Sequence, residues 1–144
     1  MIKIICVGKL KEDYLNNLVD DYLKRISKYH KIIIHEIKDS NSKEETKKII
    51  QLLDKKDYNI LLDINGEMIT SDELASKLKK LFIFSSRINF VIGGSDGLEN
   101  DVLEYINEKI SFSKLTFPHG LFRGILLEQI YRTFKINNNE KYHK

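Results

Sequence analysis

The last three residues, Tyr142-His143-Lys144, place a phenol beside the only imidazole of the C-terminal tail. Histidine titrates close to neutral pH, so it can serve as a general acid or base. A tail of this kind is either functional or a frayed chain end, because terminal residues are commonly poorly ordered. Arg132 precedes it within a helix-like stretch and adds a guanidinium, which suits phosphates and other anions.

A glycine-rich loop, Gly93-Gly94-Ser95-Asp96-Gly97, follows an apolar run. Three glycines in five residues allow positive φ and a close approach of the backbone to a ligand. The spacing is not that of the G-x-G-x-x-G dinucleotide fingerprint, and no Gly-Lys-Ser/Thr follows as in a Walker A loop. The loop is therefore either a ligand-binding turn of another kind or a tight connection between a strand and a helix.

Two kinds of chemistry have no support in the sequence. The four histidines, His30, His35, His119 and His143, show no i, i+4 pairing and no neighbouring cluster of ligands, so we expect no metal site. Cys6 lies inside an apolar run and no Gly-x-Ser-x-Gly elbow occurs, so a covalent cysteine or serine nucleophile is not predicted.

The charge is distributed unevenly along the 144 residues. The net charge is +3, but residues 109–144 hold seven basic and two acidic side chains, while residues 1–108 hold 17 basic and 19 acidic ones. A basic C-terminal quarter favours an anionic partner such as RNA, although a solvated basic helix and tail would look the same. No run is long enough to span a membrane and no signal-peptide cleavage region is present, so a cytoplasmic protein is expected.

Alternating strand and helix signals run along the whole chain. Helical apolar stripes separate the β-rich runs, and two segments, Ser42–Glu45 and Thr70–Glu73, match capping boxes. Asn65-Gly66 is a turn dipeptide. The pattern predicts a single α/β domain over residues 1–144, with a mostly parallel sheet flanked by helices. The strands are expected at residues 2–7, 31–37, 58–64, 88–92 and 112–117, and the helical stripes at residues 15–26, 49–53, 74–81, 102–110 and 121–134. Ligands bind beyond the carboxyl ends of such strands, here near residues 62–66 and 93–97.

Five stretches of the chain together carry a resemblance to a known family. They are Ile4–Leu10, Leu62–Gly66, Phe90–Leu98, Phe112–His119 and Leu127–Ile136, the last continuing through Tyr142-His143-Lys144. On these residues the chain resembles the SPOUT-class methyltransferases that methylate N3 of a pseudouridine in 23S ribosomal RNA. The match runs from end to end in order, and the C-terminal third is the most similar part.

The resemblance implies a C-terminal trefoil knot, a homodimer and S-adenosylmethionine as cofactor. It implies a pseudouridine in helix 69 of 23S rRNA as the target, methylated within the assembled ribosome. Carried over residue by residue, the cofactor-binding positions are Leu62, Gly93, Phe112, Ser113, Lys114, Leu115, Thr116 and Phe117. Apolar walls suit adenine, and glycine with exposed backbone amides suits the ribose and the amino-acid end.

The resemblance also implies roles for the polar C-terminal residues. The N3 proton must leave, and His143 is the best candidate for the general base. Tyr142 could stack on the target base, and Arg132 could bind a phosphate or stabilise the deprotonated imide. Two alternatives stay open: an RNA- or ribosome-binding module that has lost catalysis, and a SPOUT methyltransferase acting on tRNA.

Two departures from the family pattern are visible. The segment 38–57 is shorter than is usual for the family, from which we expect a trimmed surface helix. Gly120 and Gly124 stand where larger side chains are expected, and Gly124 inside a helix costs about 1 kcal/mol relative to alanine.

Overall fold

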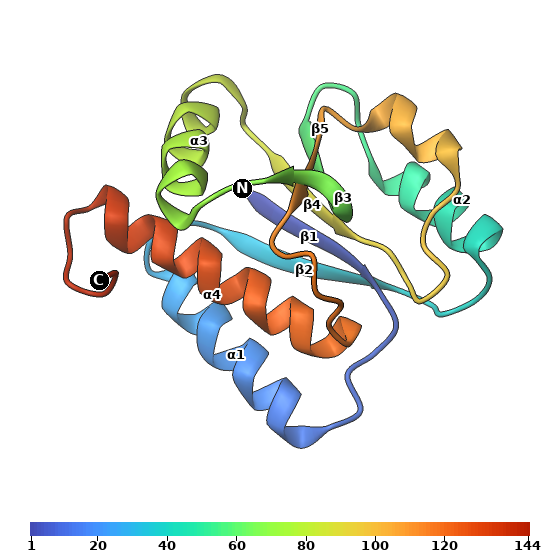
Figure 1. Cartoon of the computed structure of the whole chain (residues 1–144), viewed down its shortest axis with the longest axis horizontal. Coiled ribbons are helices and arrows are strands. Elements are labelled where there is room, and N and C mark those ends of the chain that lie inside the picture. Colours follow the sequence, from blue (N-terminus) through green and yellow to red (C-terminus); the bar gives the residue numbers. More distant parts are fainter.

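Five strands form one fully parallel sheet in the computed structural model, which describes residues 1–144. They are β1 (Ile2–Val7), β2 (Ile32–Ile37), β3 (Tyr58–Met68), β4 (Ile88–Ile92) and β5 (Glu108–Ser111). Their order across the sheet is β2-β1-β4-β3-β5 (Figure 1). The predicted α/β class with a mostly parallel sheet is confirmed.

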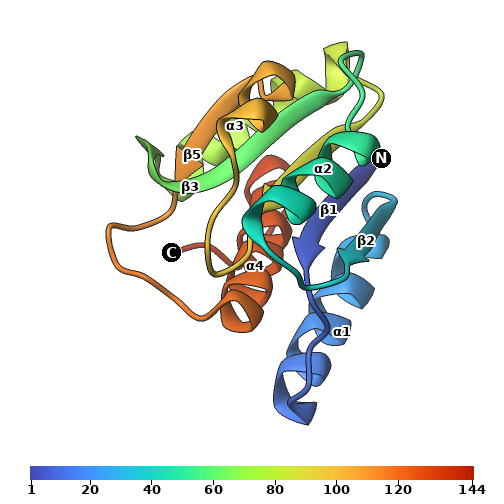
Figure 2. The same cartoon turned by 90° about the vertical axis from the view of Figure 1, so that its right-hand side faces the viewer.

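Helices cover both faces of this sheet. Helices α1 (Asp13–Ser27), α3 (Ser71–Phe84) and α4 (His119–Asn137) pack on one face. The other face holds α2 (Ser42–Leu52), into which the short 38–57 segment folds, and a 3₁₀ helix, η1 (Asn100–Tyr105). Figures 1 and 2 both show α1 and α4 side by side, and Figure 1 shows the C-terminus near the last turn of α4.

Two hydrophobic cores follow from the alternation of side chains along the strands. In β1, Ile2, Ile4 and Cys6 point to the larger core under α1, α3 and α4, whereas Ile5 belongs to the core under α2 and η1. Both faces are apolar, as is usual for a parallel sheet covered on two sides. Burial raises the pKa of the Cys6 thiol to about 11, in agreement with a structural rather than a nucleophilic cysteine.

The two predicted capping boxes have different outcomes. Before α3 the box is confirmed: Thr70 Oγ1 accepts from the Glu73 backbone N–H, and a Glu73 carboxylate oxygen accepts from that of Thr70. Before α2 the prediction is wrong, because Asn41 is the cap and accepts from the Glu44 N–H at 2.9 Å. Ser42 instead donates to the carbonyl oxygen of Gly97, which ties the start of α2 to the glycine loop.

Three other local predictions are wrong. Asn65-Gly66 is not a turn but part of β3, which shifts register against β5 between Leu62 and Glu67. A Cβ at Gly66 would lie 2.8 Å from the Ile110 backbone, so this close approach requires glycine. The fifth strand ends at residue 111, and residues 112–118 are irregular. The stripe over 102–110 forms only a 3₁₀ helix, because Ile110 belongs to β5.

The two unexpected glycines of α4 let α1 approach closely. A Cβ at Gly124 would overlap the Leu18 side chain, and one at Gly120 would lie 2.9 Å from Leu15 Cδ1. The helix-propensity loss at these glycines is thus offset by close packing between the two helices.

Candidate functional site

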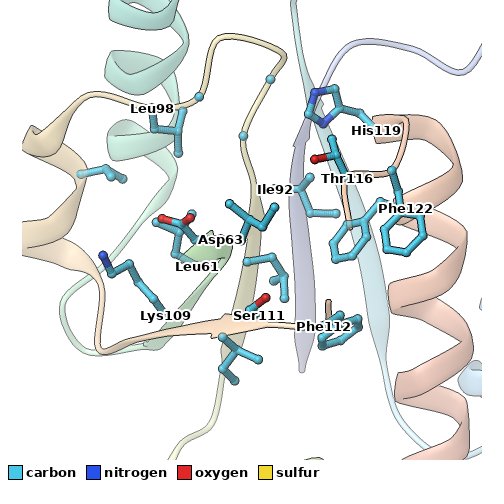
Figure 3. A pocket seen from close by; sticks show the side chains of 18 of the residues that line it. Leu61, Asp63, Ile92, Leu98, Lys109, Ser111, Phe112, Thr116, His119 and Phe122 are labelled. Carbon is cyan, nitrogen blue, oxygen red and sulfur yellow. The ribbon is translucent and has the colours of Figure 1, made fainter. Parts of the chain in front are cut away.

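A cavity of about 410 Å³ lies at the carboxyl ends of β3 and β4. Its walls come from the end of β3, the glycine loop, η1, β5 with the irregular segment after it, and the start of α4 (Figure 3). This volume falls in the range of small-molecule sites, and its place is where ligands bind in open parallel sheets. Both loops expected at a ligand site, 62–66 and 93–97, contribute to the walls.

Most of the predicted cofactor residues line this cavity. They are Leu62, Gly93, Phe112, Ser113, Leu115, Thr116 and Phe117. Lys114 is exposed and does not line it. Sequence reasoning missed Leu98 and Phe122, which complete the apolar wall. Phe122 is one turn into α4, and only its place in the helical stripe could have indicated an inward orientation.

The glycine loop is packed tightly around its backbone. A Cβ at Gly93 would lie 3.1 Å from Leu98 Cγ, and one at Gly94 would lie 2.5 Å from a Glu45 carboxylate oxygen. Gly97 has a φ of +71°, so one of the three glycines adopts the positive φ that they allow. Gly93 and Gly94 therefore leave little room for side chains between the loop and its neighbours, whereas Gly97 has open space and is required by its backbone conformation.

Glu45 is a buried carboxyl beneath this loop. Burial is the main cause that raises its pKa, with further contributions from Asp39 and the negative charge of Asp96. The Ser40 backbone N–H donates to Glu45 Oε2 at 2.8 Å and acts in the opposite direction. Glu45 thus holds the connection between β2 and α2 against the back of the glycine loop.

Aromatic side chains form one side of the cavity. The ring centroid of Phe122 lies 5.5 Å from that of Phe112 and 6.2 Å from that of Phe117. Leu115, on the same segment, is 71% exposed. Apolar groups open to the cavity in this way favour a ligand with a planar apolar part.

The C-terminal tail is folded back onto α4 rather than frayed. Arg132 Nη1 lies 3.0 Å from His143 Nδ1, and the guanidinium stacks on the Tyr142 ring at 4.7 Å. The Tyr142 hydroxyl donates to Glu128 Oε1 at 3.2 Å, and Glu128 also forms a salt bridge with Arg132. The structure therefore brings all three predicted catalytic residues, Arg132, Tyr142 and His143, into one cluster with Glu128.

This tail cluster, Glu128, Arg132, Tyr142 and His143, has a defined charge state. Burial, together with Tyr22 and Glu128, raises the pKa of Tyr142 well above its usual value, so its hydroxyl keeps its proton. The hydrogen bond with Glu128 raises the pKa of Arg132 further. The cluster therefore presents a phenol and a guanidinium rather than a phenolate.

The cavity and the tail cluster lie apart along α4 of the same chain. Phe122 lines the cavity, and Arg132 lies ten residues further on, a distance of about 15 Å at 1.5 Å per residue. A smaller hollow of about 190 Å³, to which Ile125 and Gln129 contribute, lies between these points along the helix. The predicted cofactor and catalytic residues therefore do not meet in one pocket of one chain.

Arg123, in the first turns of α4, is a buried arginine. It forms a salt bridge with Glu36 at 2.5 Å, and its Nη2 donates to the Gly8 carbonyl oxygen at 3.2 Å. Arg123 therefore attaches the start of α4 to the carboxyl ends of β1 and β2, next to the cavity-lining Phe122.

Two features are absent from the structure. No group of three or more histidine, cysteine, aspartate or glutamate side chains is arranged to hold a metal ion. No helix of the structure has both the length and the apolar character needed to cross a membrane.

Known proteins resemble this chain over its full length. A family model described as "Predicted SPOUT methyltransferase" matches residues 1–143. The protein named ribosomal RNA large subunit methyltransferase H from Clostridium novyi is 48% identical over 157 aligned residues, covering 99% of both chains. Its namesake from Oenococcus oeni is 46% identical, covering 99% of this chain and 98% of its own length. A solved structure of "a probable methylase family protein" from Haemophilus influenzae is 12% identical with a TM-score of 0.56, covering 99% of this chain and 70% of its own length, and supports the fold alone.

Proposed function

Because this chain belongs to the SPOUT methyltransferase family, we propose that it transfers a methyl group from S-adenosylmethionine to N3 of a pseudouridine in 23S ribosomal RNA. The names of the full-length relatives support ribosomal RNA as the substrate. The base, its place in helix 69 and the assembled ribosome come from the family resemblance. We propose a cytoplasmic location, because the proposed substrate is ribosomal RNA.

The cavity at the sheet edge is the observation that carries this proposal. It is lined by seven of the eight residues that the resemblance assigns to the cofactor, although these come from three separate segments of the chain. Phe112, Phe117 and Leu115 offer apolar contact to an adenine, and the bare backbone of Gly93 offers close approach to polar groups. The apolar side chains and the accessible glycine backbone of this cavity therefore fit S-adenosylmethionine.

The residues of the chain contribute mainly position and charge. When bound, the sulfonium cofactor supplies an activated methyl group, so alignment with the acceptor nitrogen is the main requirement. We assign to Tyr142 stacking on the target base and to Arg132 binding of RNA phosphate or of the charge that develops on the base. His143 contacts the polar edge of the base. The excess of basic residues in 109–144 supports RNA as the partner.

A homodimer would bring the two separated parts together. In a two-fold dimer with α4 packed antiparallel on its copy, the tail end of one helix lies beside the cavity end of the other. The outward positions of α4 suit such contact, because Leu121 is exposed and Ile125 is half-buried. We propose that the tail of one protomer completes the cavity of its partner.

Replacing Gly93 by valine tests the cofactor site. A Cβ at residue 93 would lie 3.1 Å from Leu98 Cγ. The two methyl groups that valine carries on this Cβ would push Leu98 into the cavity. We expect Gly93→Val to weaken S-adenosylmethionine binding at least tenfold by titration calorimetry and to abolish tritiated methyl transfer to ribosomes from a methylation-deficient strain. The circular dichroism spectrum should stay unchanged.

The matched control is Ser85→Val, which adds valine to extended backbone at the opposite edge of the sheet. It should bind cofactor like the unmodified protein. Equal affinity of both variants would refute the assigned cofactor site. If the unmodified protein binds cofactor but methylates only tRNA, the tRNA methyltransferase alternative holds. If it methylates no RNA, the alternative of a binding module without catalysis holds.

A further inference from the structure

Glu128 is the centre of the tail cluster, although neither the sequence motifs nor the family assignment gives it a role. Its carboxylate accepts from Arg132 Nε at 3.0 Å and from Arg132 Nη2, and it accepts from the Tyr142 hydroxyl at 3.2 Å. Its other oxygen accepts from Gln129 Nε2 at 2.8 Å. The side chains of Glu128 and Arg132 are only 20% and 24% exposed, so these bonds are partly shielded from water.

Glu128 binds Nε and Nη2 of Arg132, and this leaves Nη1 directed towards the tail. Arg132 Nη1 lies 3.0 Å from His143 Nδ1. A guanidinium has donors and no acceptor, so Nδ1 of His143 must be the acceptor and carries no proton. The neutral ring then carries its proton on Nε2, which lies 3.7 Å from an Asp72 carboxylate oxygen at the start of α3. Both neighbours therefore favour the same tautomer.

We propose that Glu128 is a positioning residue that, through Arg132, fixes His143 as a hydrogen-bond donor rather than as the general base. In this arrangement His143 has no free lone pair to accept a proton, because Nδ1 is bound by Arg132 and Nε2 is protonated. Its Nε2–H instead suits a ring carbonyl oxygen of the target base. This inference rests on the proposed function and revises the role that residue type alone gives to His143.

The proposed reaction balances without a protein base. The methyl carbon bonds to N3 as its bond to sulfur breaks, and the sulfur keeps the electron pair. The N3 proton leaves to solvent water, and the neighbouring carbonyl oxygen, on which negative charge develops, accepts the hydrogen bond from Nε2–H of His143. Arg132 and His143 belong to the same tail cluster, so they act together whichever protomer holds the cofactor.

Nitrogen NMR of histidine-labelled protein tests the tautomer without any turnover. Long-range proton–nitrogen correlations show which ring nitrogen of His143 carries the proton, and His143→Gln assigns the signals. We expect the Nε2–H tautomer in the unmodified protein and a mixture of tautomers in Glu128→Ala. An Nδ1–H tautomer in the unmodified protein would overturn the proposal, and an unchanged tautomer in Glu128→Ala would remove the role of Glu128.

Methyl-transfer kinetics test independently whether His143 acts as a donor or as a base. Glutamine at 143 keeps an N–H donor but cannot act as a base, so His143→Gln should retain a kcat at least tenfold above that of His143→Ala. Equal loss in both variants would support a base and contradict the inference. We expect Glu128→Ala to lower kcat about 10- to 100-fold with unchanged cofactor affinity, through misalignment of the tail.

The control for Glu128 is Glu104→Ala, which removes a carboxylate from an exposed pair with Lys55, away from the tail. It should leave kcat unchanged. If the unmodified protein fails to methylate ribosomal RNA, the proposed function fails, but the tautomer measurement still decides the arrangement of Glu128, Arg132 and His143.

Discussion

His30 is an imidazole whose surroundings differ from those of His143 in the tail. Its ring lies 4.5 Å from the Phe82 centroid and 5.9 Å from that of Phe134, and its buried Nε2 has no hydrogen-bond partner. Burial, with a smaller contribution from the N-terminal ammonium, lowers its pKa below 6.5. His30 is therefore a neutral packing residue.

This lowered pKa predicts acid sensitivity of the fold. Below about pH 6.5 the unfolded chain binds a proton at His30 that the folded chain does not, so stability decreases as pH falls from there towards the folded pKa. Thermal unfolding of His30→Phe should show a smaller loss of midpoint temperature between pH 7 and pH 5 than the unmodified protein. His35→Phe, at an exposed position on β2, serves as the control and should keep the full loss. Identical losses in all three proteins would contradict this prediction.

At the scale of the structural elements, the close contact between α1 and α4 depends on glycine at positions of α4 that face α1. Gly124→Ala gains up to about 1 kcal/mol of helix propensity but overlaps Leu18, and overpacking typically costs 1–3 kcal/mol. We expect a net loss of about 1 kcal/mol of unfolding free energy in urea titrations. Shortening the opposing residue in Gly124→Ala/Leu18→Ala should make the effect of alanine at 124 favourable. A stabilising Gly124→Ala alone would show that the two helices can move apart without loss.

Sequence patterns predicted the elements where local and tertiary preferences agree. The Thr70–Glu73 box is signalled by two side chains three residues apart, and the strands at 2–7 and 88–92 by short apolar runs that a glycine follows. The segment 112–117 failed as a strand because its side chains, apart from Lys114, line the cavity rather than a sheet face. Cavity linings and strands use the same residue types, so local pattern cannot separate them.

The candidate site was predictable only in part for a related reason. The resemblance named most of the cavity wall, but the burial of Arg123 depends on Glu36, a residue 87 positions away, and no local signal marks that pair. The role of Glu128 likewise emerges only when the tail folds back on α4. Contacts between distant segments were the part of the site that could not be read from spacing.

At the scale of the whole molecule, a single domain over residues 1–144 and a C-terminal trefoil knot stay predictions. The sheet order supports one domain, since β1 lies between β2 and β4 and is covered by α4 from the other end of the chain. The chain after β5 loops out before it enters α4 (Figure 2). The knot itself is an implication of the family resemblance.

The proposed dimer makes two predictions about assembly. Light scattering should give about twice the chain mass of 16.9 kDa. Mixing Gly93→Val with a variant that lacks residues 142–144 should restore methyl transfer, because the mixed dimer joins an intact cavity of one protomer to an intact tail of the other. Inactive mixtures that demonstrably exchange subunits would show that each chain uses its own tail, and a fully active monomer would contradict the dimer.

Cys6 is buried in β1, where it pairs with Glu36 of β2 and lies in the core that α4 covers, so its reactivity reports how often the fold opens. It is the only cysteine of the chain, and its raised pKa and burial keep it from reacting with thiol reagents while the sheet is closed. Labelling of the unmodified protein therefore proceeds only through openings that reach the centre of the sheet. Mass spectrometry counts the labelled molecules, and each of them has opened once. The rate of labelling therefore measures the opening rate of the fold, with and without cofactor, and no reporter group has to be introduced.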